Sequence, residues 1–356
     1  MKKTKSTNAK YCGTSKNKVL CIGSMGKDVF FPVSSGMVME SGDEQGKTKQ
    51  FCFRYGGKVH VEDRFSALGG CACNVSIGLS RLGIDVSAFG NVGDDYDGKW
   101  IKKILDDEHV NIKNINTVQK GDTDMSVIIV DSNVGERTIF VNRDVGEKMV
   151  LKTEDVGGFD WCFVGSLYGE HIESNMKVIH DALLQTNLKL VYNPGGKNIK
   201  QDENIVLDLI HHASLVFVNK MEAREIVSKF DLSYTEEELS DEQYLLATIK
   251  EHMQDETGVV VVTDGRLGAW AYDGKNTYHT DTIDKPVHDA TGAGDAFASG
   301  FFAGILYKLP LDKCIQWGSV NGDAVVDYYG AQKGLQTCGI IQERTELFVV
   351  ENKKKK

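Results

Sequence analysis

Short runs of consecutive apolar residues recur along the chain and constrain its fold class. The runs "VLCIG", "WCFVG" and "VVVVTDG" begin at Val19, Trp161 and Val259. A strand without alternating polar residues must be covered by protein on both faces. Segments with helical periodicity lie between such runs, as at 95–110 and 172–185. The alternation predicts an α/β fold with a mostly parallel central sheet between helical layers.

Two regions interrupt this alternation of strands and helices. Residues 29–67 and 121–144 combine polar-apolar alternation with turn residues such as "SSG", "YGG" and "SNVGE". This pattern is typical of β-hairpins, so we expect both regions to form a small β-sheet lid. No Ser/Gly-rich or Pro-rich linker separates them from the rest. The sequence therefore predicts one domain over 18–346, with a basic tail at 1–17 and a lysine-rich tail at 347–356.

Charge and cysteine usage limit the classes of partner and compartment. The net charge is −10 and the isoelectric point is about 5.4, which argues against nucleic acid or an anionic membrane as the main partner. The eight cysteines include no CxxC pair, and we expect most of them to be small core residues of a reduced protein. No apolar run is long enough for a signal peptide or a membrane span. A cytoplasmic location is expected.

The segment "DATGAGDAFASGF" places a glycine-rich turn directly before an apolar helix. Gly292, Ala293 and Gly294 allow successive backbone N–H groups to point at one spot, and the helix adds its positive end. Asp295 would stand beside any anion bound there. These residues alone leave two interpretations open: a turn that caps a helix, or an anion-binding cradle next to a general base.

Two long motifs resemble the signatures of a known family. "DATGAGDAFASGF" resembles the C-terminal signature of the ribokinase/PfkB family of carbohydrate kinases, and "GGCACNVSIGLSRLG", at 69–83, resembles its N-terminal signature. The similarity extends over about residues 18–345, with the motifs in the family's order. It implies a ribokinase-like three-layer α/β/α sandwich with a β-sheet lid, and an ATP-dependent kinase that requires Mg²⁺.

The resemblance also implies roles for the residues of the C-terminal motif. Asp295 corresponds to the catalytic base that accepts the proton of the substrate hydroxyl. Gly292, Ala293 and Gly294 correspond to the anion hole for the transferred phosphoryl group. Asp289 and Thr291 match positions that hold a monovalent cation, K⁺ or Na⁺, in many members.

The substrate side is implied by residues near the N-terminal motif. By resemblance, Gly69, Gly70 and Asn74 contact the substrate, and Asp28 accepts hydrogen bonds from its hydroxyl groups. Two arginines of the segment "GERTIFVNRD" allow two interpretations. Arg137 or Arg143 could bind an acidic or phosphorylated sugar, and Arg143 is then the substrate-binding candidate. Alternatively, both arginines could form ion pairs with carboxylates of the lid.

Three further segments resemble the family's nucleotide side. "VNKMEA" matches N-x-x-E, which makes Asn219 and Glu222 candidates for organising Mg²⁺ through water, with a helix cap as the alternative. "VVVVTDGRLGAW" ends a strand in T-x-G-x-x-G. The remaining nucleotide-binding candidates are Thr263, Gly265, Gly268 and Asn321.

The sequence thus predicts a kinase that phosphorylates a hydroxymethyl group of a sugar or sugar-like molecule. A nucleoside kinase of the same family is the alternative. A catalytically silent sugar- or nucleotide-binding protein is disfavoured, because binding alone needs no base at Asp295. Pairing of lids between subunits in this family also makes a homodimer an expectation.

Overall fold

A ten-stranded central sheet forms the middle layer of the protein, which is described here from a computed structural model over residues 15–43, 46–134, 136–201, 203–230 and 232–354. The strand order is β16-β15-β14-β13-β12-β11-β10-β1-β6-β7. The strands from β7 to β13 run parallel, and β14, β15 and β16 continue the sheet antiparallel. The strands are β1 (Lys18–Ile22), β6 (Asp85–Gly93), β7 (Ile115–Val118), β10 (Trp161–Val164), β11 (Lys189–Tyr192), β12 (Leu215–Asn219), β13 (Val259–Thr263), β14 (Ala269–Tyr272), β15 (Asn276–Thr280) and β16 (Glu351–Lys354).

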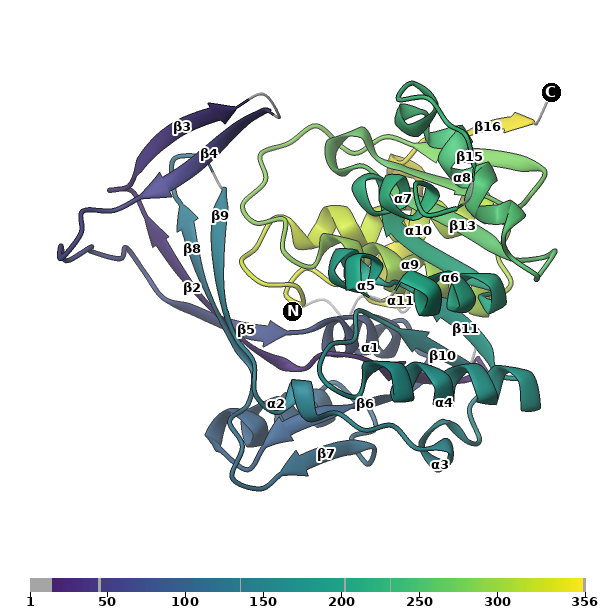
Figure 1. Ribbon diagram of the computed structural model, residues 1–356, viewed down its shortest axis with the longest axis horizontal. Coiled ribbons are helices and arrows are strands. Elements are labelled where there is room, and N and C mark those ends of the chain that lie inside the picture. Colours follow the sequence, from purple (N-terminus) through teal and green to yellow (C-terminus); the bar gives the residue numbers. More distant parts are fainter. Residues whose placement is uncertain (1–14, 44–45, 135, 202, 231, 355–356) are drawn as a thin grey trace, which may run out of the picture.

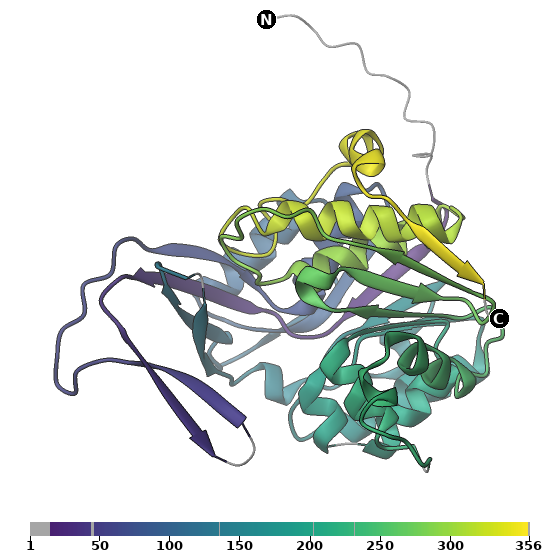
Figure 2. The same ribbon diagram turned by 90° about the horizontal axis from the view of Figure 1, so that it is seen from above.

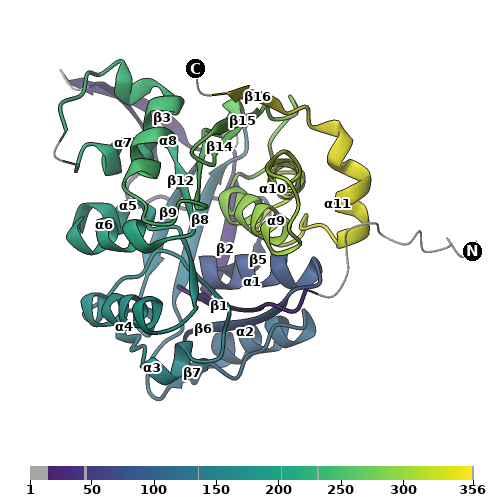
Figure 3. The ribbon, with the colours of Figure 1, turned by 90° about the vertical axis from the view of Figure 1, so that its right-hand side faces the viewer.

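Helices cover both faces of this sheet, as Figure 3 shows. One face is covered by α1 (Cys71–Arg81), α2 (Tyr96–Asp107), α9 (Ala293–Leu306), α10 (Leu311–Val325) and α11 (Cys338–Arg344). The other is covered by α3 (Thr153–Val156), α4 (Ile172–Gln185), α5 (Gly195–Gln201), α6 (Glu203–His212), α7 (Lys220–Val227) and α8 (Glu242–Glu251). In β1, Val19 and Cys21 belong to the first core, and Leu20 and Ile22 to the second. The expected three-layer α/β/α sandwich is confirmed, and the need for two buried faces explains the continuous apolar runs.

A second, four-stranded sheet of order β5-β2-β8-β9 projects from one side of the body (Figures 1 and 2). Its strands are β2 (Gly26–Val33), β5 (Phe65–Gly69), β8 (Met125–Asp131) and β9 (Arg137–Asn142). We call this sheet the lid. The segment between β2 and β5 forms a separate hairpin of β3 (Met37–Asp43) and β4 (Gly46–Cys52) that is not hydrogen-bonded into the lid. The lid and hairpin strands fall within or next to the two regions for which hairpins were expected.

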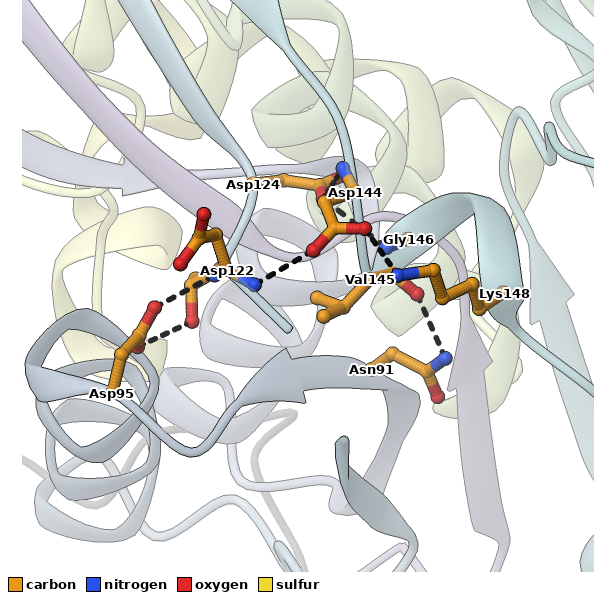
Figure 4. A network of polar contacts seen from close by, with 9 residues as sticks. Asn91, Asp95, Asp122, Asp124, Asp144, Val145, Gly146 and Lys148 are labelled. Atoms are coloured by element: carbon orange, nitrogen blue, oxygen red, sulfur yellow. Dashed lines mark hydrogen bonds and ion pairs between the residues drawn. The ribbon is translucent and has the colours of Figure 1, made fainter. Parts of the chain in front are cut away.

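The lid joins the body at a polar network shown in Figure 4. The Asp124 carboxylate, just before β8, accepts hydrogen bonds from the backbone N–H groups of Asp144 (2.9 Å) and Gly146 (3.1 Å), which follow β9. Asn91, in β6, donates to the carbonyl oxygen of Val145 at 2.8 Å. One carboxylate therefore holds together the start of β8 and the end of β9, and Asn91 fastens this junction to the central sheet.

The C-terminal segment differs from the expected solvated tail. Residues 351–354 form β16, which pairs antiparallel with β15, for example His279 with Glu351. The edge of β15 offers unpaired backbone groups, and pairing satisfies them in spite of the lysines. Residues 1–14 and 355–356, which belong to the predicted tails, lie outside the described residues. Among the described helices, none has the length and apolar character needed to cross a membrane.

Candidate active site

The predicted anion cradle lies at the N-terminus of α9. Gly292 is the N-cap and has a left-handed backbone with φ 75°. A Cβ atom at this position would lie 2.1 Å from the Cβ of Ala331, so both the conformation and the close approach require glycine. Within the described part of the chain, the backbone N–H groups of Gly294 and Asp295 donate to no protein acceptor. These unpaired first-turn amides, together with the helix dipole, favour an anion.

Asp295 lies in the first turn of α9 beside these amides. Its Oδ2 accepts a hydrogen bond from Nδ2 of Asn74, on α1, at 2.7 Å. Burial raises the pKa of the Asp295 carboxyl, while the Asn74 hydrogen bond acts in the opposite direction. A carboxylate with a raised pKa is a stronger proton acceptor than an exposed one. The structure thus joins the two sequence motifs through the side chain proposed as the base.

Gln332 orients Asn74, and sequence reasoning did not identify it. Its Nε2 donates both to the Oδ1 of Asn74 and, at 2.9 Å, to the carbonyl oxygen of Leu68. With Oδ1 occupied as an acceptor, the Asn74 amide must direct its Nδ2 donor toward Asp295. Gln332 lies in the irregular segment after α10, where no periodicity or motif marks it.

Asp28 and Gly69 lie together on the substrate side, on the paired strands β2 and β5. A Cβ atom at Gly69 would lie 2.5 Å from Oδ1 of Asp28, so glycine leaves this carboxylate room. Burial raises the pKa of Asp28 to about 6, and the negative charges of Asp289 and Asp295 add to this, whereas a hydrogen bond from Ser126 opposes it. These contributions indicate that Asp289 and Asp295 are near enough to Asp28 for their charges to act on it.

Gly70 follows Gly69 and forms the N-cap of α1. Its φ is 96°, and a Cβ atom there would lie 2.1 Å from the carbonyl oxygen of Ser24. The backbone at this position can therefore approach the segment after β1 only if the residue is glycine.

A cavity of about 590 Å³ opens at the N-terminus of α9, next to the cradle. Three predicted nucleotide-binding residues line it: Thr263, Gly265 and Gly268. Ala293 and Gly294 line the same cavity. Its size suits a small ligand.

Arg137, on lid strand β9, also lines this cavity. Its Nε is buried and has no hydrogen-bond partner in the described part of the chain. Sequence reasoning left Arg137 open between a substrate contact and a lid ion pair. A buried guanidinium donor without an acceptor is costly, and an anionic ligand in the cavity would relieve this cost.

Asn321 does not line the cavity, contrary to the sequence-based expectation of a nucleotide contact. Its side chain is fully buried in α10, donates to Oγ of Ser299 at 3.2 Å and accepts from the backbone N–H of Gln336 at 3.0 Å. These contacts join α9, α10 and the following segment. The residues of α10 that line the cavity near this position are Ser319, Gly322 and Asp323.

Asn219 and Glu222 form a capping box at the start of α7. Asn219 accepts from the backbone N–H of Glu222 at 2.9 Å, and the Glu222 carboxylate accepts from that of Asn219 at 3.0 Å. The structure therefore contains the helix cap that was the alternative interpretation of these two residues. Asn219 also pairs in register with Thr263, which puts the capping box at the carboxyl edge of the sheet. A carboxylate in this place fits a hydrated Mg²⁺, which needs only contacts through water.

Asp289 is buried and its carboxylate is held by three donors. Oδ1 accepts from the backbone N–H (2.9 Å) and Oγ1 (2.7 Å) of Thr291, and Oδ2 accepts from the N–H of Gly330 (3.0 Å). These bonds fix the turn that precedes the cradle. The oxygen-rich donor set is of the type that binds hard cations.

Arg143 does not form the ion pair with a lid carboxylate that was one of its two interpretations, within the described residues. Its guanidinium stacks on the ring of Tyr168 at 3.7 Å from the ring centre, and no ion pair with a lid carboxylate is present there. The Tyr168 hydroxyl donates to Asp124 at 2.5 Å. Arg143 is thereby linked to the root of the lid rather than to Asp28 or Asn74.

Comparison with known proteins identifies the family. A model of the pfkB family of carbohydrate kinases matches residues 16–338. The chain belongs to this family, whose members are ATP-dependent phosphotransferases.

Individual relatives are similar over most of their length. The nucleoside kinase of Methanocaldococcus jannaschii is 23% identical over 335 residues, covering 94% of this chain and 98% of the relative. The fructokinase of Vibrio alginolyticus is 26% identical over 284 residues, covering 76% and 88%. Among solved structures, a Burkholderia thailandensis nucleoside kinase in complex with inosine matches with a TM-score of 0.73 at 20% identity, covering 92% of this chain and 98% of that one. A Cryptococcus neoformans ribokinase in complex with ADP gives 0.71 at 23%, covering 92% and 99%. These structures share the fold.

Proposed function

We propose that the chain transfers the γ-phosphoryl group of ATP to a hydroxymethyl group of a sugar or sugar-like molecule. The observation that carries this proposal is the first turn of α9, which holds Asp295 together with the unpaired amides of Gly294 and Asp295. Ala293 and Gly294 of the same turn line the 590 Å³ cavity. A base and donors for phosphoryl charge are the two elements that such a transfer needs.

In the proposed mechanism, Asn74 holds one oxygen of Asp295 and leaves the other for the substrate hydroxyl. Asp295 takes the hydroxyl proton as the oxygen attacks the γ-phosphate in line. The cradle amides of Gly292, Ala293 and Gly294 are assigned to the charge of the transferred group. The N–H of Ala293 also donates to the carbonyl oxygen of Ala290 at 3.3 Å, and this bond must open or be shared when the anion binds. Asp28, with Gly69 leaving room beside it, accepts hydrogen bonds from other hydroxyl groups of the substrate, and Gly70 and Asn74 contact the substrate from the start of α1.

Two ions complete this proposal. Mg²⁺ would neutralise phosphate charge when bound, and Asn219 and Glu222 would hold it through water. Asp289 and Thr291 are the proposed residues for K⁺ or Na⁺ near the cradle. On the nucleotide side, Thr263, Gly265 and Gly268 approach ATP as backbone and hydroxyl contacts.

The Asp295→Asn variant tests the proposed base. The amide has the shape of the carboxylate but cannot accept the proton, so kcat should fall about 10²–10⁴-fold, while ATP binding measured by calorimetry persists. Asp312→Asn, in the first turn of the neighbouring α10, is the matched control and should retain activity. An unchanged turnover rate for Asp295→Asn would show that another group acts as the base.

A nucleoside is the second candidate substrate, because relatives of comparable similarity are nucleoside kinases. ADP release from ATP can be compared for ribose, fructose, 2-keto-3-deoxygluconate, fructose phosphates, adenosine and other nucleosides. The highest kcat/KM for a free sugar supports the proposal. The highest value for a nucleoside selects the alternative with the same catalytic residues.

We also propose a homodimer that forms through the lid. Three consecutive residues of β9 have exposed apolar side chains. The exposed fraction is 45% for Ile139, 60% for Phe140 and 51% for Val141. Exposed apolar clusters of this kind mark association sites. Light scattering after size exclusion should give twice the mass of 39.3 kDa, and Phe140→Asp should shift the protein to monomer. A monomer for the unmodified chain at micromolar concentration contradicts this interface.

A further inference from the structure

Two histidines and an aspartate lie together on the outer helical layer, far from the cradle in the topology of the fold. His180 belongs to α4, and Asp208 and His212 belong to α6. These helices lie side by side in Figures 1 and 3 and are in contact. Asp208 and His212 are four residues apart on one helix, so they share a face that is directed toward the neighbouring helix.

The potential ligand atoms of these residues are close enough for one ion. Nε2 of His180 lies 3.6 Å from Oδ2 of Asp208, and Nε2 of His212 lies 3.9 Å from Oδ1 of the same carboxylate. One ligand atom from each residue lies within 4.8 Å of the others. With metal–ligand bonds of about 2.0–2.2 Å, ligands of a tetrahedral site lie roughly 3.3–3.6 Å apart. Small side-chain rotations would complete such a site.

The backbone beneath the cluster is held in place. Ile179, next to His180, and Leu209, next to Asp208, are both fully buried in the same core. The helices that carry the three side chains are therefore fixed relative to each other by packing, while the side chains themselves remain half-buried or exposed. The helical backbone is thus rigid, while the three potential ligand side chains are accessible to solvent.

We propose that His180, Asp208 and His212 bind a single Zn²⁺ or a similar first-row divalent ion, with water completing the coordination. Two imidazoles and one carboxylate are a ligand set that prefers such ions to Mg²⁺ or Ca²⁺. The ion fastens α4 to α6 and thereby stabilises this side of the sheet.

A simple His–Asp ion pair is the alternative arrangement. It requires protonated imidazoles, whereas a divalent ion binds neutral ones, so the ion pair and the metal site exclude each other. The other charged groups nearby are Asp181, 3.6 Å from Nδ1 of His180, and Lys177, which pairs with Asp181.

The proposed site is separate from phosphoryl transfer. The helix α6 ends at His212, directly before β12 begins at Leu215, so this histidine lies at the amino edge of the parallel strands. The cradle and the capping box lie at their carboxyl edge. The two sites are therefore separated by the length of the parallel strands. We expect the ion to affect the stability of the protein rather than its turnover rate.

The test uses the full chain after treatment with EDTA, with Mg²⁺ in excess and ZnCl₂ as the probe. Equilibrium dialysis should show one more bound Zn²⁺ for the unmodified chain than for a His180→Gln/His212→Gln double variant. Each single variant should bind this ion at least about tenfold more weakly. Zn²⁺ should raise Tm for the unmodified chain and not for the double variant.

His211→Gln is the matched control, because this adjacent histidine is directed to the carbonyl oxygen of His252 at 2.9 Å. It should retain the extra Zn²⁺ and the rise in Tm. Co²⁺ should give the intense visible bands of a low-coordinate site with the unmodified chain and with His211→Gln only. Equal Zn²⁺ stoichiometry and equal Tm shifts for all variants would overturn the proposal.

Discussion

Nδ2 of Asn74 donates to Oδ2 of Asp295 at 2.7 Å and connects two residues that are 221 positions apart in the chain. The bond crosses between α1 and α9. The two helices approach so closely at Gly78 that an added Cβ atom would lie 2.2 Å from Oγ of Ser299, so the missing side chain of glycine permits this approach. The proposed base is therefore held by a side chain from the other signature motif. Neither motif is complete without the packing of these two helices.

Gln332 is expected to act as a positioning residue through Asn74. In Gln332→Met, the Asn74 amide loses its fixed orientation, and kcat should fall by about 10²-fold or less with little change in KM for ATP. Gln336→Met is the control, since its side chain bonds only to the carbonyl oxygen of Gly334 among the described residues. Steady-state kinetics of both variants give the comparison, and equal kcat values would exclude the positioning role.

Two glycines of the cradle should respond oppositely to alanine. Gly292→Ala forces a left-handed backbone and a clash with Ala331, which should reduce the free energy of unfolding by about 1–3 kcal/mol. At Gly294, nothing lies within 4 Å of an added Cβ atom, and alanine should preserve or raise stability by up to about 1 kcal/mol. Urea unfolding distinguishes the two, and similar losses for both would contradict the described turn.

The raised pKa of Asp28 predicts a stability that falls as pH rises. The pKa of Asp28 is about 6 in the folded state, whereas that of an unperturbed aspartate carboxyl is 3.8. Between these values the folded state binds more protons than the unfolded state, so this group's stabilisation is complete below pH 3.8 and is lost as pH rises through about 6. The loss amounts to about 3 kcal/mol.

Asp28→Asn should remove this dependence. Relative to the unmodified chain, the variant should gain stability from pH 4 to pH 7 in urea titrations, while substrate binding weakens because the charged acceptor is gone. Parallel pH profiles of the two proteins would show that Asp28 ionises normally in the fold.

Arg137 and Arg143 should have separable effects. Arg137→Met removes a guanidinium from the lining of the cavity, and the KM for ATP should rise or kcat fall by about tenfold or more. Arg143→Met removes only the stacking on Tyr168 and should leave the KM for ATP unchanged. If Arg143→Met raised the KM for ATP more than Arg137→Met did, ATP would bind outside the cavity that Arg137 lines.

The sequence predicted the parts of the fold that depend on local pattern. The apolar helix expected directly after the glycine-rich turn is α9, at 293–306, because its apolar residues and preceding glycines are local signals. The mostly parallel central sheet followed from the apolar runs, and the family followed from the two motifs. Asn74, expected to contact the substrate, and Asp295, expected to be the base, are hydrogen-bonded to each other, and the charge of Asp295 acts on Asp28.

Other features depend on contacts that no local pattern marks. Gln332 acquires its role only because its loop returns to α1. Asn321 matches a family position, but its partners Ser299 and Gln336 come from other elements, which the sequence does not reveal. The lysines of β16 suggested a solvated tail, whereas the open edge of β15 determined its conformation.

The junction at Asp124 makes the lid a lever with a fixed base. Because one carboxylate ties the ends of β8 and β9 together and also receives the Tyr168 hydroxyl, the lid cannot slide along the body. Rotation about this point leaves the base almost in place and gives the largest displacement at the distant end, where Arg137 begins β9. A rotation of the lid about Asp124 would therefore displace Arg137, which lines the 590 Å³ cavity, more than it displaces the residues near Asp28.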